Sequence, residues 1–456
     1  MSEESLPVGW IATKCSEFCS GRNKTFNPTT ATESSYVLYS VPSHATGQPE
    51  IVTPKEIGSS KQYVTRGDTL ISKINPHLNR TWVVGDHPKQ IVIASTEWIV
   101  FAKSPAVDPG FISFYLRQST VRDFLCHNAS GIGGSLTRIK PAVFDQIPLP
   151  VPPLAEQKRI VAKIEELFSE LDAGEESLRR ARRQLGVYRQ SLLKQAFEGK
   201  LTAPWRAQHP DASAPRETTL TELVEIKSGN GFPMQYQDGK DGDFPFFKVG
   251  DISRNAQAGR RKLGRADNYI SAAILKKIRG TLIPPNATVF AKIGAAVALN
   301  RRAITSQSCL IDNNAMALVP CDKLDPDFLY LFMRQVDLGE KTRGGAVPSL
   351  RKGDIEEIPI LLPSLPEQQE IVCLLGGQFE VIEQNEREID AALKRSEALR
   401  QSILKKAFTG QLVPQDPTDE PASALLARIR KERENTLKAT VPFRKRPLGK
   451  GRRRAR

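Results

Sequence analysis

Two nearly identical lines of sequence decide the fold: RQSLLKQAFEGKLT (189–202) and RQSILKKAFTGQLV (400–413) share nine of fourteen positions. They lie 211 residues apart, and the same offset relates IPLPVPPLAEQKRIV (147–161) to IPILLPSLPEQQEIV (358–372). A continuous stretch of about 70 residues is thus written twice without an insertion. Two copies are too few for a solenoid, so the duplication predicts a pseudo-twofold pair.

The repeat becomes weaker upstream. DPGFISFYLRQ (108–118) matches DPDFLYLFMRQ (325–335) at an offset of 217, so a loop between the two matched stretches differs in length. Before that, only a loose pattern remains, such as GDTLISKI (67–74) against NATVFAKI (286–293). Each copy therefore has a divergent first part of about 140 residues and a well-kept second part of about 50.

The well-kept part predicts a long helix. Pro152 and Pro153 precede it, and Gly199 is placed to end it. Apolar residues recur at alternating spacings of three and four, which is typical of a coiled-coil seam. We expect the two helices to pack together as one rod, although two separate amphipathic helices stay an alternative. The predicted seam is Ile164, Leu167, Leu171, Leu178, Leu185 and Leu192 in the first copy, and Ile371, Leu375, Ile382, Ile389, Leu399 and Ile403 in the second.

The divergent parts predict two α+β globular domains. Runs such as QIVIASTEWIVFAK and ATVFAKIGAAVAL are typical of short strands, and one amphipathic helix is predicted in each domain, at 109–126 and 326–338. The predicted order is a first domain (1–152), a long helix (153–201), a linker (202–217), a second domain (218–363), a second long helix (364–413), and a short helix with a basic tail (414–456).

Composition bounds the class of protein. The 456 residues are 39% hydrophobic and 25% charged, enough to bury several cores. No apolar run reaches the roughly 18 residues of a membrane span, and the first residues lack a signal-peptide pattern, so we expect a cytoplasmic protein. The net charge is +14, and the last 16 residues hold eight Lys or Arg, which predicts a basic arm for polyanions or merely a solubilising tail.

Catalytic patterns are missing from the sequence. It contains no phosphate-binding loop, no dinucleotide fingerprint and no methyltransferase motif. The six cysteines and five histidines have no metal-ligand spacing, and reduced thiols are expected. We therefore predict a protein without its own active site, metal or cofactor.

Polar and basic loops in the two domains are the candidate functional residues. Arg and Asn can read guanine and adenine edges, while Lys, Ser and Thr hold phosphates. A solvated surface charge is the alternative for any single residue. The candidate DNA contacts are Arg22, Asn23, Lys24, Lys73, Asn79, Arg80, Ser135, Thr137, Arg138 and Lys140 in the first domain, and Lys227, Asn230, Arg254, Asn255, Arg261, Lys292, Arg301, Arg302, Arg343, Ser349, Arg351 and Lys352 in the second.

The paired helix motifs resemble those of the specificity subunit of type I restriction–modification systems. Each helix opens on the pattern of 147–161 or 358–372 and closes on that of 189–202 or 400–413, so the resemblance covers nearly the whole chain. It implies two target-recognition domains that read the halves of an asymmetric, bipartite double-stranded DNA target. It also implies that the helices form an antiparallel rod, which sets the spacing of the halves.

The resemblance further implies partners. Two methylation subunits would dock on the rod, bind S-adenosylmethionine and methylate one adenine in each half-site. Restriction subunits would join for ATP- and Mg-dependent translocation and cleavage. This chain would supply specificity and no catalytic group. Two alternatives stay open: a scaffold whose globular domains bind proteins, and a specificity chain that serves a single bifunctional methylase–nuclease.

Overall fold

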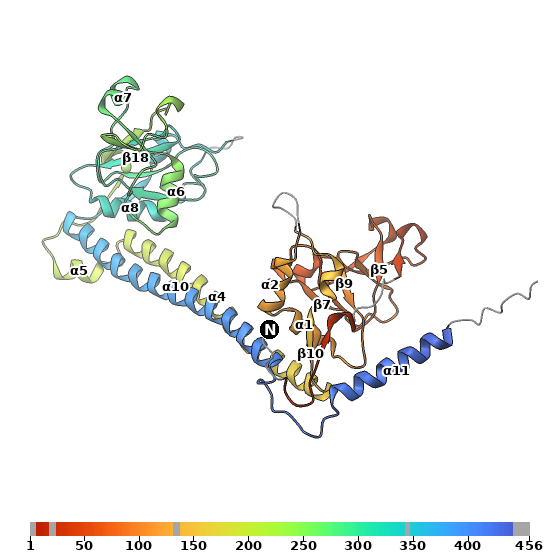
Figure 1. The fold of residues 1–456 in the computed structure, drawn as a ribbon. Helices are drawn as coiled ribbons and strands as arrows, with labels where there is room; N and C mark the ends of the chain where they lie inside the picture. The colour runs from red at the N-terminus through yellow and green to blue at the C-terminus, as the bar shows by residue number, and fades with distance from the viewer. Residues whose placement is uncertain (1–5, 18–23, 131–136, 343–346, 441–456) are drawn as a thin grey trace, which may run out of the picture. The chain divides into compact units, whose positions relative to one another are not determined.

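Two compact units make up the chain in this computed structural model (Figure 1). Unit 1 comprises residues 1–176 and 392–456, and unit 2 comprises 177–391. Among the residues that the structure describes, no helix is long and apolar enough to cross a membrane. The described residues are 6–17, 24–130, 137–342 and 347–440, with the backbone alone for 432–440.

The first domain, in unit 1, is built on two sheets with strand orders β2-β5-β8-β3-β4 and β7-β6-β9. Neighbouring strands in both sheets are antiparallel, except for β3 and β8, which are parallel. The strands are β1 (Ile11–Lys14), β2 (Thr25–Phe26), β3 (Tyr36–Tyr39), β4 (Glu50–Val52), β5 (Lys61–Tyr63), β6 (Thr69–Ser72), β7 (Thr81–Val83), β8 (Val92–Ser95), β9 (Trp98–Phe101) and β10 (Pro148–Val151), and the helices are α1 (Pro109–Leu116), α2 (Ser119–His127) and α3 (Pro141–Phe144).

The single helix predicted over 109–126 was wrong, because the chain breaks into α1 and α2 there. Gln118 is extended, with φ −62° and ψ 146°. Helix α1 buries every side chain from Phe111 to Leu116, whereas α2 buries only two of its nine residues, so the segments need different orientations. The Ser119 N–H, freed by the break, donates to the Gln401 side chain at 2.9 Å.

The second domain, in unit 2, has sheets of strand order β12-β18-β15-β16 and β14-β13-β17. The helix predicted over 326–338 ends at Gln335, because Val336 is extended with ψ 121°. The strands are β11 (Arg216–Thr219), β12 (Val224–Ser228), β13 (Phe244–Phe247), β14 (Asn268–Ile270), β15 (Thr288–Ala291), β16 (Arg302–Ile304), β17 (Leu310–Ile311), β18 (Ala315–Pro320) and β19 (Pro359–Leu362), and the helices are α5 (Ala203–Gln208), α6 (Val249–Gln257), α7 (Ala272–Lys277), α8 (Pro326–Gln335) and α9 (Lys352–Glu356).

The duplication extends into these divergent domains. Strands β7-β6-β9 correspond in order and direction to β16-β15-β18. A helix follows in each case, α1 or α8, with proline at its first position. Its N-cap aspartate, Asp108 or Asp325, accepts hydrogen bonds from the amides two and three residues later. The framework is therefore repeated where the sequence retains only a loose pattern.

The two long helices are α4 (Leu154–Phe197) and α10 (Leu365–Phe408), each of 44 residues. They pair antiparallel inside each unit. In unit 1 the Ser396 hydroxyl of α10 donates to Glu175 of α4 at 2.7 Å. In unit 2 the Tyr188 hydroxyl of α4 donates to Gln378 of α10 at 3.3 Å. Later residues of α4 thus meet earlier residues of α10, so the pair is antiparallel, as expected.

The predicted seam is buried most deeply near the domains. Leu399 departs from it: its side chain is 51% exposed. The helix face turned inward there contains Ser396, Arg400 and Leu404 instead, because Arg400 pairs with acids of α4. The seam residues Ile164, Leu192, Ile371, Leu375, Ile382 and Ile389 are buried, and Leu167, Leu171, Leu178, Leu185 and Ile403 are half-buried.

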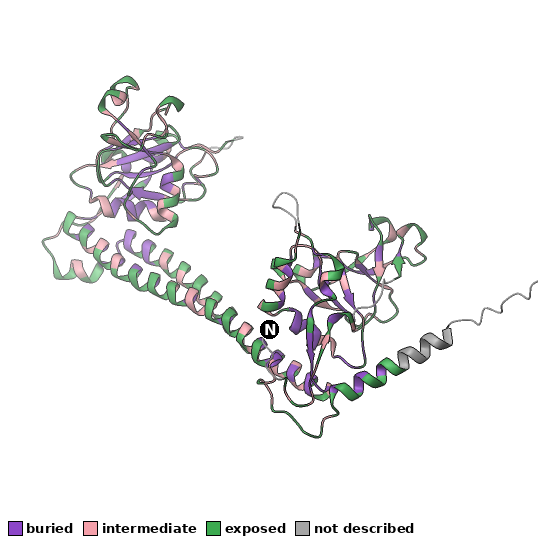
Figure 2. Cartoon of the chain, in the orientation of Figure 1, coloured by how far each residue is buried: buried purple, intermediate pink, exposed green. Residues whose placement is uncertain are grey.

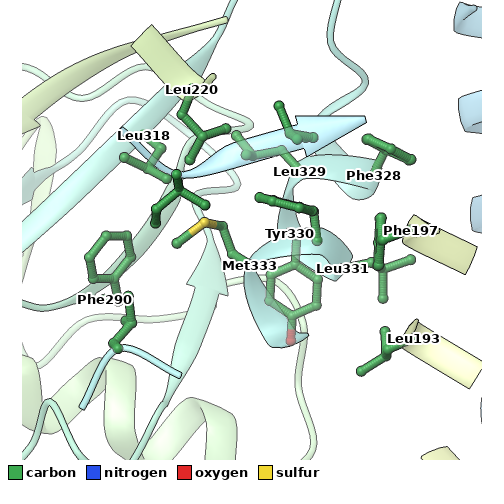
Figure 3. Close-up of a cluster of buried hydrophobic side chains, with 14 of the residues drawn as sticks. Leu193, Phe197, Leu220, Phe290, Leu318, Phe328, Leu329, Tyr330, Leu331 and Met333 are labelled. Carbon is green, nitrogen blue, oxygen red and sulfur yellow. The ribbon is translucent and has the colours of Figure 1, made fainter. Parts of the chain in front are cut away.

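Each domain packs on one end of the helix pair through α1 or α8. In unit 1 the rings of Phe111 and Phe408 meet edge-on, with centroids 5.0 Å apart. In unit 2 Phe197 of α4 meets Phe328 of α8 at 5.2 Å (Figure 3). These contacts belong to one continuous hydrophobic cluster in each unit. Burial along α4 and α10 is accordingly densest at their ends (Figure 2).

A buried glutamine near the start of each long helix fixes it to its domain. In unit 1 the Gln157 amide accepts from the Asp108 N–H at 2.8 Å and donates to two backbone carbonyls. In unit 2 Gln368 accepts from the Asp325 N–H at 2.8 Å and donates to two carbonyls at equivalent positions. Both side chains are fully buried. These contacts explain why the glutamine is repeated in the helix motif.

Segments outside the repeat complete each unit. Strand β1 pairs with β10 in unit 1, and β11 pairs with β19 in unit 2. The predicted linker 202–217 is structured: it contains α5, and Thr202 donates to the buried Glu367 at 2.6 Å. Helix α11 (Ala422–Thr440) contributes Leu425, Leu426 and Ile429 to the hydrophobic cluster of unit 1. The basic tail, 441–456, lies outside the described residues.

Replacing either glutamine should loosen one unit only. Gln157→Ala leaves an amide and two carbonyls without partners in unit 1, which should cost about 2–4 kcal/mol. Hydrogen exchange should quicken at 106–116 while 323–331 stays protected, and Gln368→Ala should do the reverse. The exposed Gln190→Ala is the matched control and should change neither segment. Equal loss of protection in both segments would contradict separate anchoring.

Candidate nucleic-acid interface

The end of strand β6 gathers several predicted contacts of the first domain. The Lys73 N–H donates to the Glu97 carbonyl, and the Lys73 carbonyl accepts from Ile139, both at 2.9 Å. Its ammonium donates to the Thr96 carbonyl, and burial lowers its pKa. Arg138 forms an ion pair with the Glu97 carboxylate at 2.8 Å. Lys73, Thr137 and Arg138 are thus brought together, next to the exposed Lys140.

The end of strand β15 repeats this arrangement in the second domain. The Lys292 N–H donates to the Asn314 carbonyl at 2.8 Å, and its carbonyl accepts from Leu350 at 2.9 Å. Ser349 forms a bridge to Ile293, as Arg138 does to Ile74 in the first domain. The predicted contacts Lys292 and Ser349 therefore lie together. Arg351 and Lys352 follow at the start of α9, where Lys352 pairs with Glu356 at 3.4 Å.

A second matching pair, Asn79-Arg80 and Asn300-Arg301, precedes the outer strands β7 and β16. Both asparagines are left-handed, with φ of 42° and 51°, a conformation that asparagine adopts more readily than most residues. The next residues, Thr81 and Arg302, face equivalent positions of β6 and β15. Sequence reasoning selected Asn79, Arg80 and Arg301 but missed that they correspond, since the offset here is 221 rather than 211 or 217.

Arg302 lies inside the second domain, which does not fit the predicted contact with DNA. Its side chain is 3% exposed, and the guanidinium donates to the carbonyls of Asn300, at 2.8 Å, and Val336. Burial, together with the nearby charge of Arg334, lowers its pKa to about 10. Arg302 therefore holds the end of α8 against β16.

The remaining candidates of the second domain all have partners within the domain. The Asn230 and Asn255 amides bind backbone and hold loops, so they are not free to read an adenine edge. The contacts are Asn230 with the Thr281 N–H (2.7 Å), Asn255 with the Arg260 carbonyl (2.8 Å), Arg254 with Asp251 and Asp267, Arg261 with Asp327 (3.2 Å), and Lys227 with Glu225 (3.5 Å).

Four predicted contacts, Arg22, Asn23, Ser135 and Arg343, lie outside the described residues. Lys24 is exposed just before β2. Within the described part of the chain, no group of three His, Cys, Asp or Glu residues is placed to hold a metal ion.

An arginine–phenylalanine–glutamate cluster on the long helices was missed by sequence reasoning. In unit 2 Arg189 pairs with Glu386 at 3.3 Å and lies over the Phe379 ring at 5.7 Å. The signal was in the sequence, because Arg189 opens the repeated line and all three residues recur at the offset of 211. The equivalents in unit 1 are Arg400, Glu175 and Phe168, with an ion pair of 3.1 Å and a ring distance of 5.1 Å.

The comparisons with known proteins agree with this duplicated design. The model of the type I restriction modification DNA specificity domain matches twice, over 7–178 and 216–395. The chain belongs to this family. It carries two tandem specificity domains, and the family role is that of a non-catalytic DNA-recognition subunit rather than a scaffold.

Relatives of this specificity chain extend over most of its length. It is 28% identical over 353 residues to the EcoKI specificity subunit of Escherichia coli K12, covering 71% of this chain and 72% of that one. It is also 28% identical over 346 residues to the StySPI specificity subunit of Salmonella potsdam, covering 72% of each.

Solved structures share the fold. A chain from a type I restriction–modification system has a TM-score of 0.75 at 21% identity, covering 90% of this chain and all of that one. The HsdS subunit of Thermoanaerobacter tengcongensis has a TM-score of 0.56 at 23% identity, with the same coverage.

Alanine variants of Arg302 and Arg301 should distinguish a buried, structural arginine from one at the surface. Arg302→Ala removes the hydrogen bonds to Asn300 and Val336 and leaves a cavity, so unit 2 should lose about 2–4 kcal/mol of stability. The half-exposed neighbour provides the control: Arg301→Ala should change stability by no more than about 0.5 kcal/mol. Hydrogen exchange of 302–304 and 326–335 measures both. An Arg302→Ala variant of full stability but weak DNA binding would contradict the structural role.

Proposed function

We propose that each domain reads one half of an asymmetric, bipartite DNA target. The supporting observation is a common framework with different side chains on it. The hydrogen bonds around Lys73 and Lys292 are the same, but Glu97 and Arg138 of the first domain are replaced by Asn314 and Ser349 in the second. Two domains that share one framework but present different hydrogen-bond donors and acceptors would select different bases.

The pairing of α4 with α10 suits a spacer between the half-sites. We propose that the outer faces of these helices dock two methylation subunits, one for each domain, and that restriction subunits join the complex. Large apolar side chains remain exposed on α4 and α10 in unit 2, which supports docking. They are Val187 (71%), Tyr188 (47%), Leu374 (37%) and Val381 (58%).

The chemistry would then reside on the partners. S-adenosylmethionine, ATP and Mg would be bound by the methylation and restriction subunits, and this chain would act in the cytoplasm on the cell's own DNA. A single bifunctional methylase–nuclease is the alternative partner, which the genes beside this one would reveal.

The methylation pattern tests the proposal directly. Co-expression of this chain with its neighbouring methylation subunit should place one methyladenine in each half of a split motif, read by sequencing modified bases across the host genome. Omission of this chain should abolish the pattern. A continuous or palindromic motif would contradict the assignment of one domain to each half.

Single-domain variants test the division of labour. Arg138→Gln should relax one half of the motif and leave the other unchanged, and Arg351→Gln should affect the opposite half, because the two residues lie in different domains. A lost bidentate contact should reduce discrimination at its position by about 1–3 kcal/mol. The exposed helix variant Arg183→Gln should change neither half. Relaxation of both halves by one variant would rule out this division.

A further inference from the structure

Unit 2 contains an arginine-lined pocket of about 500 Å³ between the second domain and the helix pair. The helices contribute Arg182, Arg189 and Arg387, and the domain contributes four more arginines. Three acidic residues oppose these seven cations. The charged lining residues are Arg182, Arg189, Arg260, Arg301, Arg302, Arg334, Arg387, Glu383, Glu386 and Asp390.

The acids leave most of this charge uncompensated. Glu386 is already paired with Arg189 at 3.3 Å, and Asp390 with Arg182 at 2.9 Å. Among the described residues, the remaining cations have no ion pair, and Arg334 only covers the Phe379 ring at 5.5 Å. The cations without an ion pair are Arg260, Arg301, Arg302, Arg334 and Arg387, of which Arg302 lies near the Asp337 carboxylate. Guanidinium groups crowded in this way repel one another, and an anion relieves the repulsion.

Arg302 adds charge to the pocket lining rather than a direct contact. Its side chain is 3% exposed, and its Nε, like that of Arg189, is buried without a hydrogen-bond partner among the described residues. A buried cation is stabilised by a nearby anion, so an anion held by the more exposed arginines of the pocket would be favoured.

We propose that this pocket binds a backbone phosphate of duplex DNA. Guanidinium pairs match the geometry of phosphate oxygens, and Arg301 belongs to the Asn300-Arg301 turn that recurs as Asn79-Arg80 in the first domain. A phosphate contact fixes register without reading bases, so the pocket would position the second domain on its half-site. The inference rests on the proposed function, since it deepens how the chain holds its target.

The salt dependence of binding tests this. The full chain, in complex with its methylation subunit, is titrated onto a duplex with its own split target and onto a scrambled duplex, from 50 to 200 mM KCl as example conditions. Arg260→Gln combined with Arg301→Gln should lower the slope of log affinity against log salt by about 2 on both duplexes. The ratio of the two affinities should not change. Neither side chain has a hydrogen-bond or ion-pair partner among the described residues to lose, so thermal stability should not fall.

The control removes two exposed charges on the long helices, outside the pocket. Arg183→Gln combined with Arg395→Gln should leave the slope as in the wild type. A pocket variant that behaves like this control overturns the inference, as does one that loses affinity for the target duplex alone. If the pocket double variant does not fold, Arg387→Gln by itself should lower the slope by about 1.

A free phosphate compound could occupy the pocket in place of a DNA backbone phosphate. Calorimetry with pyrophosphate distinguishes this ligand from DNA. If the wild type binds pyrophosphate and the double variant does not, while both have the same salt slope for DNA, DNA is overturned as the ligand of the pocket. A wild type that shows no steep salt dependence on its target would overturn the proposed function itself. If the wild type binds its target with a steep salt dependence and the pocket variants have the same slope as the control, this inference is overturned and the proposed function stands.

Discussion

The antiparallel pairing of α4 with α10 is the constraint on which the rest of this chain depends. Because the helices run in opposite directions, each unit must combine the first half of one with the second half of the other. The contacts between the two long helices therefore occur twice with their partners exchanged. Arg189 of α4 pairs with Glu386 of α10, while Arg400 of α10 pairs with Glu175 of α4. Each copy of the repeated sequence therefore supplies one partner to each unit.

The fixed and variable parts of the molecule meet at α1 and α8. On their inner side, these helices pack on the long helices through aromatic contacts and through Gln157 or Gln368, which the repeat conserves between the copies. On their outer side, they carry sheets whose hydrogen bonding is kept but whose side chains differ. The two copies therefore differ more in the sheets than in the long helices that hold them. A framework of this kind can change what it recognises without losing its assembly.

The sequence predicted the parts in which local pattern decides structure. The long helices, their ends and the strands at β6, β9 and β15 follow from periodicity and turn residues. The break between α1 and α2 did not, since it depends on how deeply each segment is buried and on a contact from Gln401. The candidate contacts were less predictable. Residue type alone cannot tell the buried Arg302 from its neighbour Arg301, and the match to Asn79-Arg80 is hidden by loops of unequal length.

The discontinuous build of unit 1 has a consequence for synthesis. Unit 2 is one uninterrupted segment, 177–391, and everything it needs has left the ribosome once that segment emerges. Unit 1 requires Leu404, Ala407 and Phe408 of α10 and the inner face of α11 to close its hydrophobic cluster. The domain that is made first is therefore completed last. Until then its surface for α10 and α11 stays uncovered, which makes the interval before Ile429 emerges the one in which this chain most needs protection from aggregation.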